Sequence, residues 1–321
     1  MLALSAVLIR RLLPQLSTES PRQEGLRTWI EGGSFYVGIG SVADEVLFQN
    51  LRLTEIVPFI AYDFERFALS SIESALQHGT EIMGPKALGW PLVRLYYAAF
   101  FGAHAMMRAT GRAVLRLENS QALRISQIGS FYLPDFKIST GTYKWALVQN
   151  PDLTIDGQMR RLPEGGGAHD QFWKIFYEFL GSISDEVVRN KEPEATAATA
   201  EASDLRDILS SNGFSGGTWL SAVRNQLTYQ HRYGAWFPFQ KSDAETVEYM
   251  RRSEIKDSGS IRRDHNVSKH PLLAFAAGCQ LITSLSCEIA EGLCQRSGNT
   301  RFKQLLNQLR APEAAQDVSI G

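Results

Sequence analysis

An arginine and a histidine seven positions apart are the residues of this chain best suited to chemistry. Arg224 and His231 stand in the segment SAVRNQLTYQHRYGAWFP, residues 221–238, for which a helix is expected. Seven residues turn a helix by about 700°, so both side chains should lie within about 20° of one face and about 10.5 Å apart along the axis. The arginine can hold a phosphate through two parallel hydrogen bonds, and the histidine can transfer a proton near neutral pH.

This pairing suits cleavage of RNA without a metal ion. If the ribose 2′-hydroxyl is the nucleophile, no metal is needed, and the sequence has no carboxylate or histidine cluster with the spacing of a metal site. We therefore predict neither a metal nor a cofactor. Two helical turns separate the two groups, so a two-fold dimer, which lays one chain's arginine against the other's histidine, would bring them together best.

The plainer alternative is an interfacial helix whose arginine pairs with a carboxylate and whose histidine packs at the rim. Taken alone, the spacing favours this alternative, because an arginine and a histidine seven positions apart arise easily by chance. Val223 and Leu227 should anchor the neighbouring stripe of the helix in the core. Asn225 and Tyr229 form an i, i+4 pair beside the arginine.

Two other motifs are better explained as turns. Gly213–Gly217 has the G-x-S-x-G pattern of a serine hydrolase, but a helix end precedes it, whereas a hydrolase needs Ser215 on a strand-to-helix elbow near a histidine. The run from Gly38 to Ala43 fits the start of a dinucleotide-binding fingerprint. No alternation of strands and helices follows it, so we expect a glycine-bearing loop.

The rest of the chain predicts a bundle of helices around one core, with hydrophobic residues at helical intervals. The stretch 87–109 is apolar on most of its circumference and should be central. Thr218 is the expected N-cap of the helix that carries Arg224. Helices are expected from Pro58 to about residue 79 and over 87–109, 172–188, 204–209, 271–294 and 301–310.

Several stretches do not follow this helical pattern. We expect an N-terminal region, 1–58, with a short hairpin between Thr28–Ile30 and Phe35–Val37, and a helical bundle over 59–310. The bundle is interrupted by an irregular, partly β insertion over 112–168, a low-complexity loop over 191–203 and a polar loop over 251–269. The last residues, 311–321, are expected to be a disordered tail.

Composition limits the class of protein. Of the 321 residues 44% are hydrophobic, which excludes a disordered or fibrous chain, and 33 basic against 34 acidic residues exclude a uniformly basic nucleic-acid coat. Arg10 and Arg11 follow the apolar N-terminal stretch, the opposite of a secretory signal, and polar residues interrupt the longest apolar run. We expect a soluble, cytoplasmic protein with no membrane partner. Its cysteines, at helical intervals, should be buried thiols: Cys279, Cys287 and Cys294.

The segment around Arg224 resembles the HEPN superfamily, helical-bundle proteins that include many metal-independent ribonucleases of toxin–antitoxin, CRISPR and anti-phage systems. Their hallmark, R-x₄₋₆-H with a polar residue often directly after the arginine, is matched by Arg224, Asn225 and His231 at the longest spacing allowed. The stretch LVRLYYAAFFGAHAMMRATG, residues 92–111, is similar to an early helix of that bundle. The resemblance covers residues 59–111 and 170–296.

The resemblance implies an endoribonuclease that leaves a 2′,3′-cyclic phosphate and a 5′-hydroxyl, the toxin or effector of a defence or toxin–antitoxin system. Arg224 and His231 would be catalytic, with Asn225 orienting or binding the phosphate. Its partners would be RNA, a second copy of the chain in a composite active site, and an antitoxin or defence protein. The residues it suggests for substrate binding or base stacking are Tyr229, Arg232, Trp236, Phe237 and Pro238.

A rival reading of the same resemblance is a non-catalytic HEPN-like module that binds a partner protein or a nucleotide. In that protein Arg224 and His231 would be dispensable, or held in a fixed network of ion pairs. Steering of RNA by a nuclease would depend on local basic patches, because the net charge is −1. The candidates for such a patch lie in the polar loop: Arg251, Arg252, Arg262, Arg263 and Lys269.

Overall fold

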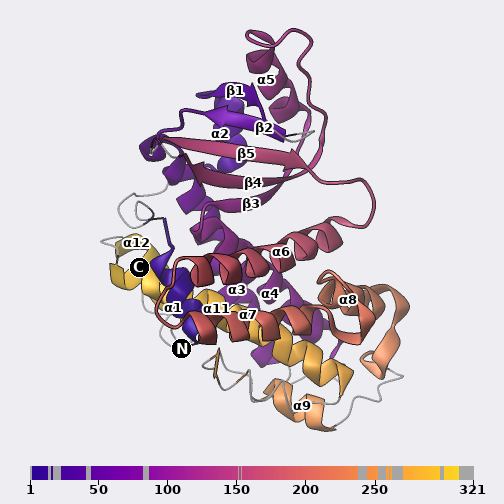
Figure 1. Ribbon diagram of the computed structural model, residues 1–321. Coiled ribbons are helices and arrows are strands. Elements are labelled where there is room, and N and C mark those ends of the chain that lie inside the picture. The colour runs from indigo at the N-terminus through magenta and orange to yellow at the C-terminus, as the bar shows by residue number, and fades with distance from the viewer. Residues whose placement is uncertain are drawn as a thin grey trace, which may run out of the picture.

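The protein is mainly α-helical, and a small antiparallel sheet is stacked on a bundle of helices (Figure 1). This confirms the predicted fold class, mainly α with a small β region. The computed structural model describes residues 2–13, 16, 23–40, 45–81, 87–150, 152, 154–237, 244–251, 258–259, 261, 270–296 and 300–310. The predicted tail and most of the predicted 251–269 loop lie outside these residues.

Three long helices form the centre of the bundle: α3 (Leu53–Glu81), α4 (Gly89–Ala109) and α11 (Pro271–Arg296). As predicted, α4 is buried on most of its circumference. A methyl group on Gly102 of α4 would approach within 3.0 Å of both Ser71 on α3 and Ser286 on α11. The small residues at this crossing therefore let the three helices pack closely, which extends the core between them.

Helix α11 is long and apolar enough to cross a membrane, but its most apolar stretch is 89% buried inside the protein. It is a core helix, because its apolar side chains contact other helices of the bundle instead of presenting a surface to lipid. Cys279 and Cys287 are buried on it, as expected, whereas Cys294 is only half-buried.

The remaining helices cover this centre. Helix α6 lies between the sheet and the bundle and packs on α7, which in turn contacts α1 and α8 (Figure 1). Helix α12 packs on α3, and α9 on α11. Their bounds are Ala3–Arg10 for α1, Ala168–Arg189 for α6, Ala195–Leu209 for α7, Trp219–Gln230 for α8, Ala244–Arg251 for α9 and Thr300–Arg310 for α12.

The sheet has the strand order β1-β2-β5-β4-β3 and is antiparallel throughout its described strands. On one face Trp29 of α2 (Leu26–Gly32) packs against Phe48 and Trp145, and the other face looks toward α6 (Figure 1). Helix α5 (Asn119–Ser130) lies beside α2. The strands are Tyr36–Ile39 (β1), Glu45–Gln49 (β2), Arg112–Leu117 (β3), Gly141–Gln149 (β4) and Ile155–Arg161 (β5).

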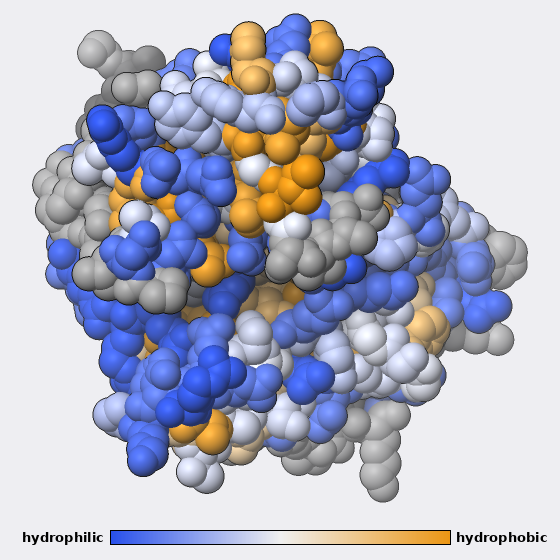
Figure 2. Space-filling model, turned by 45° about the horizontal axis from the view of Figure 1, so that its top comes forward, coloured by the Kyte–Doolittle hydropathy of each residue, from blue (hydrophilic) through white to orange (hydrophobic). Residues whose placement is uncertain are grey.

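Exposed apolar side chains gather at the outer end of the sheet layer, where Tyr36 of β1 contacts Tyr132 just after α5. Figure 2 shows apolar side chains over this part of the molecule, whereas hydrophilic side chains cover most of the rest of the same view. Phe131 is 82% exposed there.

A buried ion pair joins the sheet to the bundle. Nε of Arg108, near the end of α4, donates to Oδ2 of Asp63 on α3 at 3.2 Å. The same guanidinium donates to the backbone carbonyls of Arg112 and Val114 on β3, at 3.4 Å each. The carboxylate also accepts from Arg66 at 3.1 Å. Both side chains of the pair are more than nine-tenths buried, so each charge depends on the other.

The predicted hairpin at 28–37 is wrong. Residues 28–30 lie inside α2, and Gly33 caps that helix in the left-handed conformation, with φ of 70°. The glycine pair thus ends a helix instead of turning a hairpin, which is a common use of glycine. The hairpin that does form, β1 with β2, begins later and pairs Val37 with Phe48. Gly38 lies within β1, so the glycine-bearing loop does not begin there as expected, and the dinucleotide fingerprint is not supported either. Ala43 lies outside the described residues.

Three other boundaries differ from the prediction. Helix α3 begins at Leu53 and contains Pro58 within it, instead of starting there. The loop predicted over 191–203 is wrong, because Ala195 begins α7; the alanine-rich composition that suggested low complexity also favours a helix. The predicted insertion 112–168 holds β3, α5, β4 and β5, which complete one sheet with the N-terminal hairpin.

The ion pair yields a stability prediction. Asp63→Ala leaves Arg108 charged and unpaired in the core, so the free energy of unfolding should fall by about 3–5 kcal/mol. Urea denaturation of the two proteins measures it. Glu55→Ala removes the exposed pair of Arg52 and Glu55 at the start of the same helix and should cost less than about 1 kcal/mol. Equal, small losses from both variants would contradict the role assigned to Asp63.

Candidate active site around Arg224

Helix α8 is positioned by a glycine turn before it and a buried stripe along it. Gly217, with φ of 88°, lies so close to Tyr177 that a methyl group there would approach its Cβ within 2.7 Å. Thr218 is the N-cap residue as predicted, although its side chain makes no capping hydrogen bond. Val223 and Leu227 are buried, as expected. Arg224 therefore lies at the rim of this stripe.

The glycine turn is not a hydrolase elbow. Ser215 is exposed in the turn between a short 3₁₀ helix, Ser211–Gly213, and α8, and no strand precedes it. Among the described residues no hydrogen bond joins it to a histidine. The turn interpretation of G-x-S-x-G is confirmed.

The guanidinium of Arg224 is held by two neutral partners. Its Nη2 donates to the hydroxyl of Tyr97 on α4 at 2.6 Å, and its Nη1 donates to Oδ1 of Asn225 at 2.8 Å. Its Cζ lies 5.5 Å from the ring centroid of Tyr229 and 5.6 Å from that of Tyr97. Asn225 and Tyr229 thus both contribute to the surroundings of Arg224, as their positions on the helix suggested.

No carboxylate neutralises Arg224 within the part of the chain that the structure describes. Its Nε is buried and has no hydrogen-bond acceptor there. Burial by itself would lower the pKa of the guanidinium, but the Tyr97 hydroxyl and the neighbouring phenols of Tyr229 and Tyr96 raise the pKa above its ordinary value. The side chain is therefore a half-buried, permanent cation with spare hydrogen-bonding capacity, which suits an anionic group.

A second histidine, which the sequence did not single out, lies beside this cation. His169 stands at the start of α6, and its Nδ1 is 2.9 Å from the hydroxyl of Tyr96. That hydroxyl accepts a hydrogen bond from Nε1 of Trp173 at 3.0 Å, so its own proton is free to be donated to His169. The ring of Tyr97 lies 5.8 Å from the ring of His169. His169, the two tyrosines and Arg224 form one cluster, called here the Arg224 cluster.

The Arg224 cluster keeps His169 neutral. Burial lowers the pKa of His169, and the charge of Arg224 lowers it further, while Asp170 opposes both. Burial also raises the pKa of Tyr96 far above its ordinary value, so its phenol stays protonated. With Nδ1 accepting the hydrogen bond from Tyr96, the neutral imidazole carries its own proton on Nε2, where it is a hydrogen-bond donor. The only hint in the sequence was a histidine after a run of glycines, which says nothing of its nearness to Arg224.

His231 is not on the helix with Arg224. Helix α8 ends at Gln230, and His231 is its C-cap residue in the left-handed conformation, with φ of 49° and ψ of 34°. The prediction that one helical face carries both side chains is therefore wrong. His231 is exposed, and its ring lies 5.6 Å from the ring of Trp236. It stands at the end of α8, where a second molecule can reach it.

The residues after His231 fold back on the helix end. Trp236 is half-buried and donates from Nε1 to the carbonyl of Leu227 at 2.8 Å, which satisfies one of the free carbonyls at the end of α8. A side chain at Gly89 would collide with the Trp236 ring. Trp236 is thus a structural residue as well as a stacking candidate. Arg232 and Phe237 are exposed, and Pro238 lies outside the described residues.

His104, on α4, serves the core. It is buried between the rings of Phe67 and Phe172, whose centroids lie 4.6 and 3.8 Å away, and burial lowers its pKa well below the ordinary value. Among the described residues no three metal-binding side chains gather at one point.

The coupling of His169 to Arg224 is testable by titration. Arg224→Met removes the positive charge, so the pKa of His169 should rise toward the ordinary value of about 6.5. Histidine ring resonances followed by NMR from pH 4 to pH 8 measure the change. Arg232→Met, which removes an exposed arginine beyond the helix end, should leave the titration of His169 unchanged. If the pKa of His169 is the same in Arg224→Met as in the wild-type protein, the proposed electrostatic coupling of His169 to Arg224 is contradicted.

The sequence matches no protein-family model, and no curated protein or solved structure is significantly similar to it. The resemblance to the HEPN superfamily therefore stays a prediction that depends on the motif of Arg224, Asn225 and His231 and on the segment that forms most of α4.

Proposed function

We propose that this protein is a metal-independent endoribonuclease of the HEPN type. The observation that carries the proposal is the half-buried guanidinium of Arg224, which phenol and amide oxygens hold without a neutralising carboxylate among the described residues. An arginine kept only for structure would be expected to pair with an acid. A cation with free donors, at the rim of a helix that ends in an exposed histidine, suits the phosphate of RNA.

In the proposed reaction the ribose 2′-hydroxyl attacks the adjacent phosphorus. The bond from phosphorus to O5′ of the next nucleotide breaks, and the products carry a 2′,3′-cyclic phosphate and a 5′-hydroxyl. Arg224, with Asn225 beside it, binds the phosphate oxygens and stabilises the charge that develops in the transition state. His231 takes the proton of the 2′-hydroxyl or returns one to O5′.

Two arrangements of the active site follow from the positions of the histidines. In a two-fold homodimer, Arg224 of one chain acts with His231 of the other, because His231 is exposed at the end of α8. In the second arrangement the site lies within a single chain, and His169, which contacts Tyr96 in the Arg224 cluster and whose pKa the charge of Arg224 lowers, takes the place of His231. We favour the dimer, in which His231 and its neighbours Tyr229, Arg232 and Trp236 contact the RNA.

Its biological role is proposed from the resemblance of the motif of Arg224, Asn225 and His231 to the HEPN superfamily. A nuclease of this kind would be the toxin or effector of a defence or toxin–antitoxin system in the cytoplasm, held inactive by an antitoxin or other partner. The rival is a non-catalytic module that binds a protein or nucleotide through the same surface.

Cleavage of RNA in the presence of EDTA tests the chemistry. Wild-type protein should cut total cellular RNA into fragments with cyclic-phosphate ends, and should not cut RNA whose 2′-hydroxyls are methylated. Arg224→Ala should lower kcat/KM by about 10²–10³-fold and His231→Ala by about 10²–10⁴-fold. Gln230→Ala, beside His231 on the exposed helix end, is the matched control and should retain activity. Binding without cleavage by any of these proteins would favour the rival.

Mixing two inactive variants tests the dimer. If Arg224→Ala and His231→Ala chains exchange freely, half of the dimers are mixed and each holds one intact composite site, so about a quarter of wild-type activity should return. Light scattering and subunit exchange should be measured on the same samples. Exchange without recovered activity would contradict the composite site and favour an active site within a single chain. In that case His169→Gln should abolish cleavage.

A further inference from the structure

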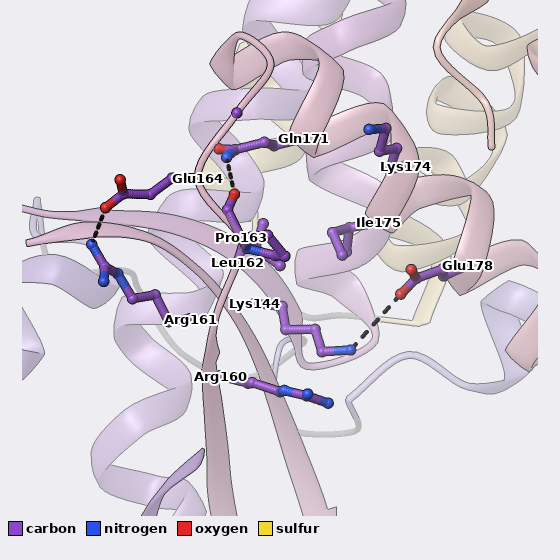
Figure 3. Close-up of a pocket in the computed structure, with 11 residues that line it drawn as sticks. Lys144, Arg160, Arg161, Leu162, Pro163, Glu164, Gln171, Lys174, Ile175 and Glu178 are labelled. Atoms are coloured by element: carbon purple, nitrogen blue, oxygen red, sulfur yellow. Dashed lines mark hydrogen bonds and ion pairs between the residues drawn. The ribbon is translucent and has the colours of Figure 1, made fainter. Parts of the chain in front are cut away.

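A groove lies between the sheet and α6. None of the residues that line it belongs to the Arg224 cluster. The groove has a volume of about 680 Å³ and is lined by β4, β5, the loop that follows β5 and the first turns of α6. Figure 3 shows Lys144 and Arg160 on the strands and Gln171, Lys174, Ile175 and Glu178 on the facing helix. Nε2 of Gln171 donates to the carbonyl of Pro163 at 2.9 Å and so fastens the loop to the helix.

The groove carries an excess of positive charge. Four basic side chains and two acidic ones line it. Lys144 faces Glu178 at 3.8 Å, and Arg161 pairs with Glu164 at 2.8 Å, so both acids are engaged. Arg160 and Lys174 make no ion pair with any described residue.

The strand register places two of these cations directly opposite each other. Lys144 on β4 is the cross-strand partner of Arg160 on β5, on the sheet face that looks toward α6. Like charges at such a pair destabilise a sheet. Glu45 of β2 is the other neighbour of Arg160 in the register, yet no ion pair joins them. A bound anion between Lys144 and Arg160 would offset their repulsion.

The remaining walls of the groove are apolar. Leu162 and Pro163 form one side and Ile175 lies opposite them on α6 (Figure 3). The volume lies in the range typical of small-molecule sites, about 300–1,000 Å³. Figure 3 draws these apolar side chains between Lys174 at one end of the groove and Lys144 with Arg160 at the other. A ligand with both phosphate groups and an apolar ring face, such as a nucleotide, matches this lining.

We propose that this groove binds a nucleotide phosphate, through Lys144, Arg160 and Lys174, at a site separate from the Arg224 cluster. The nucleotide is either free or part of a single RNA strand, since both present the same phosphate and base. This site does not require that the protein cleave RNA.

Binding of two uncleavable probes tests the groove. One is a fluorescent ATP analogue, and the other is a labelled 2′-O-methyl oligoribonucleotide of ten nucleotides, which lacks the hydroxyl needed for cleavage. Arg160→Glu/Lys174→Glu should weaken binding of at least one probe by about tenfold or more, because each change replaces a cation that would contact a phosphate with an anion that repels it. Arg52→Glu reverses an exposed arginine just before α3, outside the groove, and is the matched control.

The outcomes separate the two sources of the phosphate. Loss confined to the ATP analogue assigns the groove to a free nucleotide, and loss confined to the oligonucleotide assigns it to a nucleic-acid strand. Arg160→Gln/Lys174→Gln should show the same pattern more weakly, with circular dichroism reporting that the variants are folded. Unchanged binding of both probes, or equal weakening by Arg52→Glu, would overturn the proposal.

Discussion

The buried pair of Arg108 and Asp63 is the interaction on which the stacking of the two layers depends. Neither charge can be buried alone at an acceptable cost in free energy, so α3, α4 and the start of β3 must meet at one point. Helix α4 carries Arg108 near its end and Tyr97 near its middle, about 16 Å apart along its axis. The same rigid helix therefore positions both the sheet, with its groove, and the tyrosines that hold Arg224.

The first turns of α6 are common to the Arg224 cluster and the groove. His169 bonds to Tyr96, and Asp170 accepts a hydrogen bond from Ser221 of α8, so this side of the helix start belongs to the cluster. Gln171 and Lys174 line the groove on the other side. A ligand in the groove and a substrate at Arg224 would thus contact the same two turns of one helix, whose core side chains, such as Trp173, are fully buried.

Periodicity predicted the helices well where one face is apolar, as in α6, because a buried stripe leaves a clear pattern in the sequence. Helix α11, which is buried on most of its circumference, was predicted from its long apolar run instead. Periodicity failed where the same composition or the same glycine is compatible with two different local structures. The alanines of α7 resembled low complexity, and Gly33 resembled a hairpin turn although it caps a helix. Strand pairing between distant segments also left no local signal, so the sheet was divided between an N-terminal region and an insertion.

The candidate site was predictable only in part, for the same reason. Spacing identified Arg224 and Asn225 and placed Val223 and Leu227 in the core. It misplaced His231, because a left-handed C-cap interrupts the helical rotation that the argument assumed. Nothing in the sequence could place His169 against Tyr96, since tertiary packing alone brings α6 to α4.

The divided sheet has a consequence for how the chain assembles during synthesis. Strands β1 and β2 leave the ribosome long before β5, although Val46 of β2 must pair with Met159 of β5. A lone two-stranded hairpin is marginally stable in water, and until Trp145 is made the ring of Phe48 lacks one of its neighbours. Contacts between α3 and α4 are local and can form at once. The N-terminal strands are therefore among the last to find their place, and until then their unpaired edges are the part of the nascent chain most exposed to aggregation.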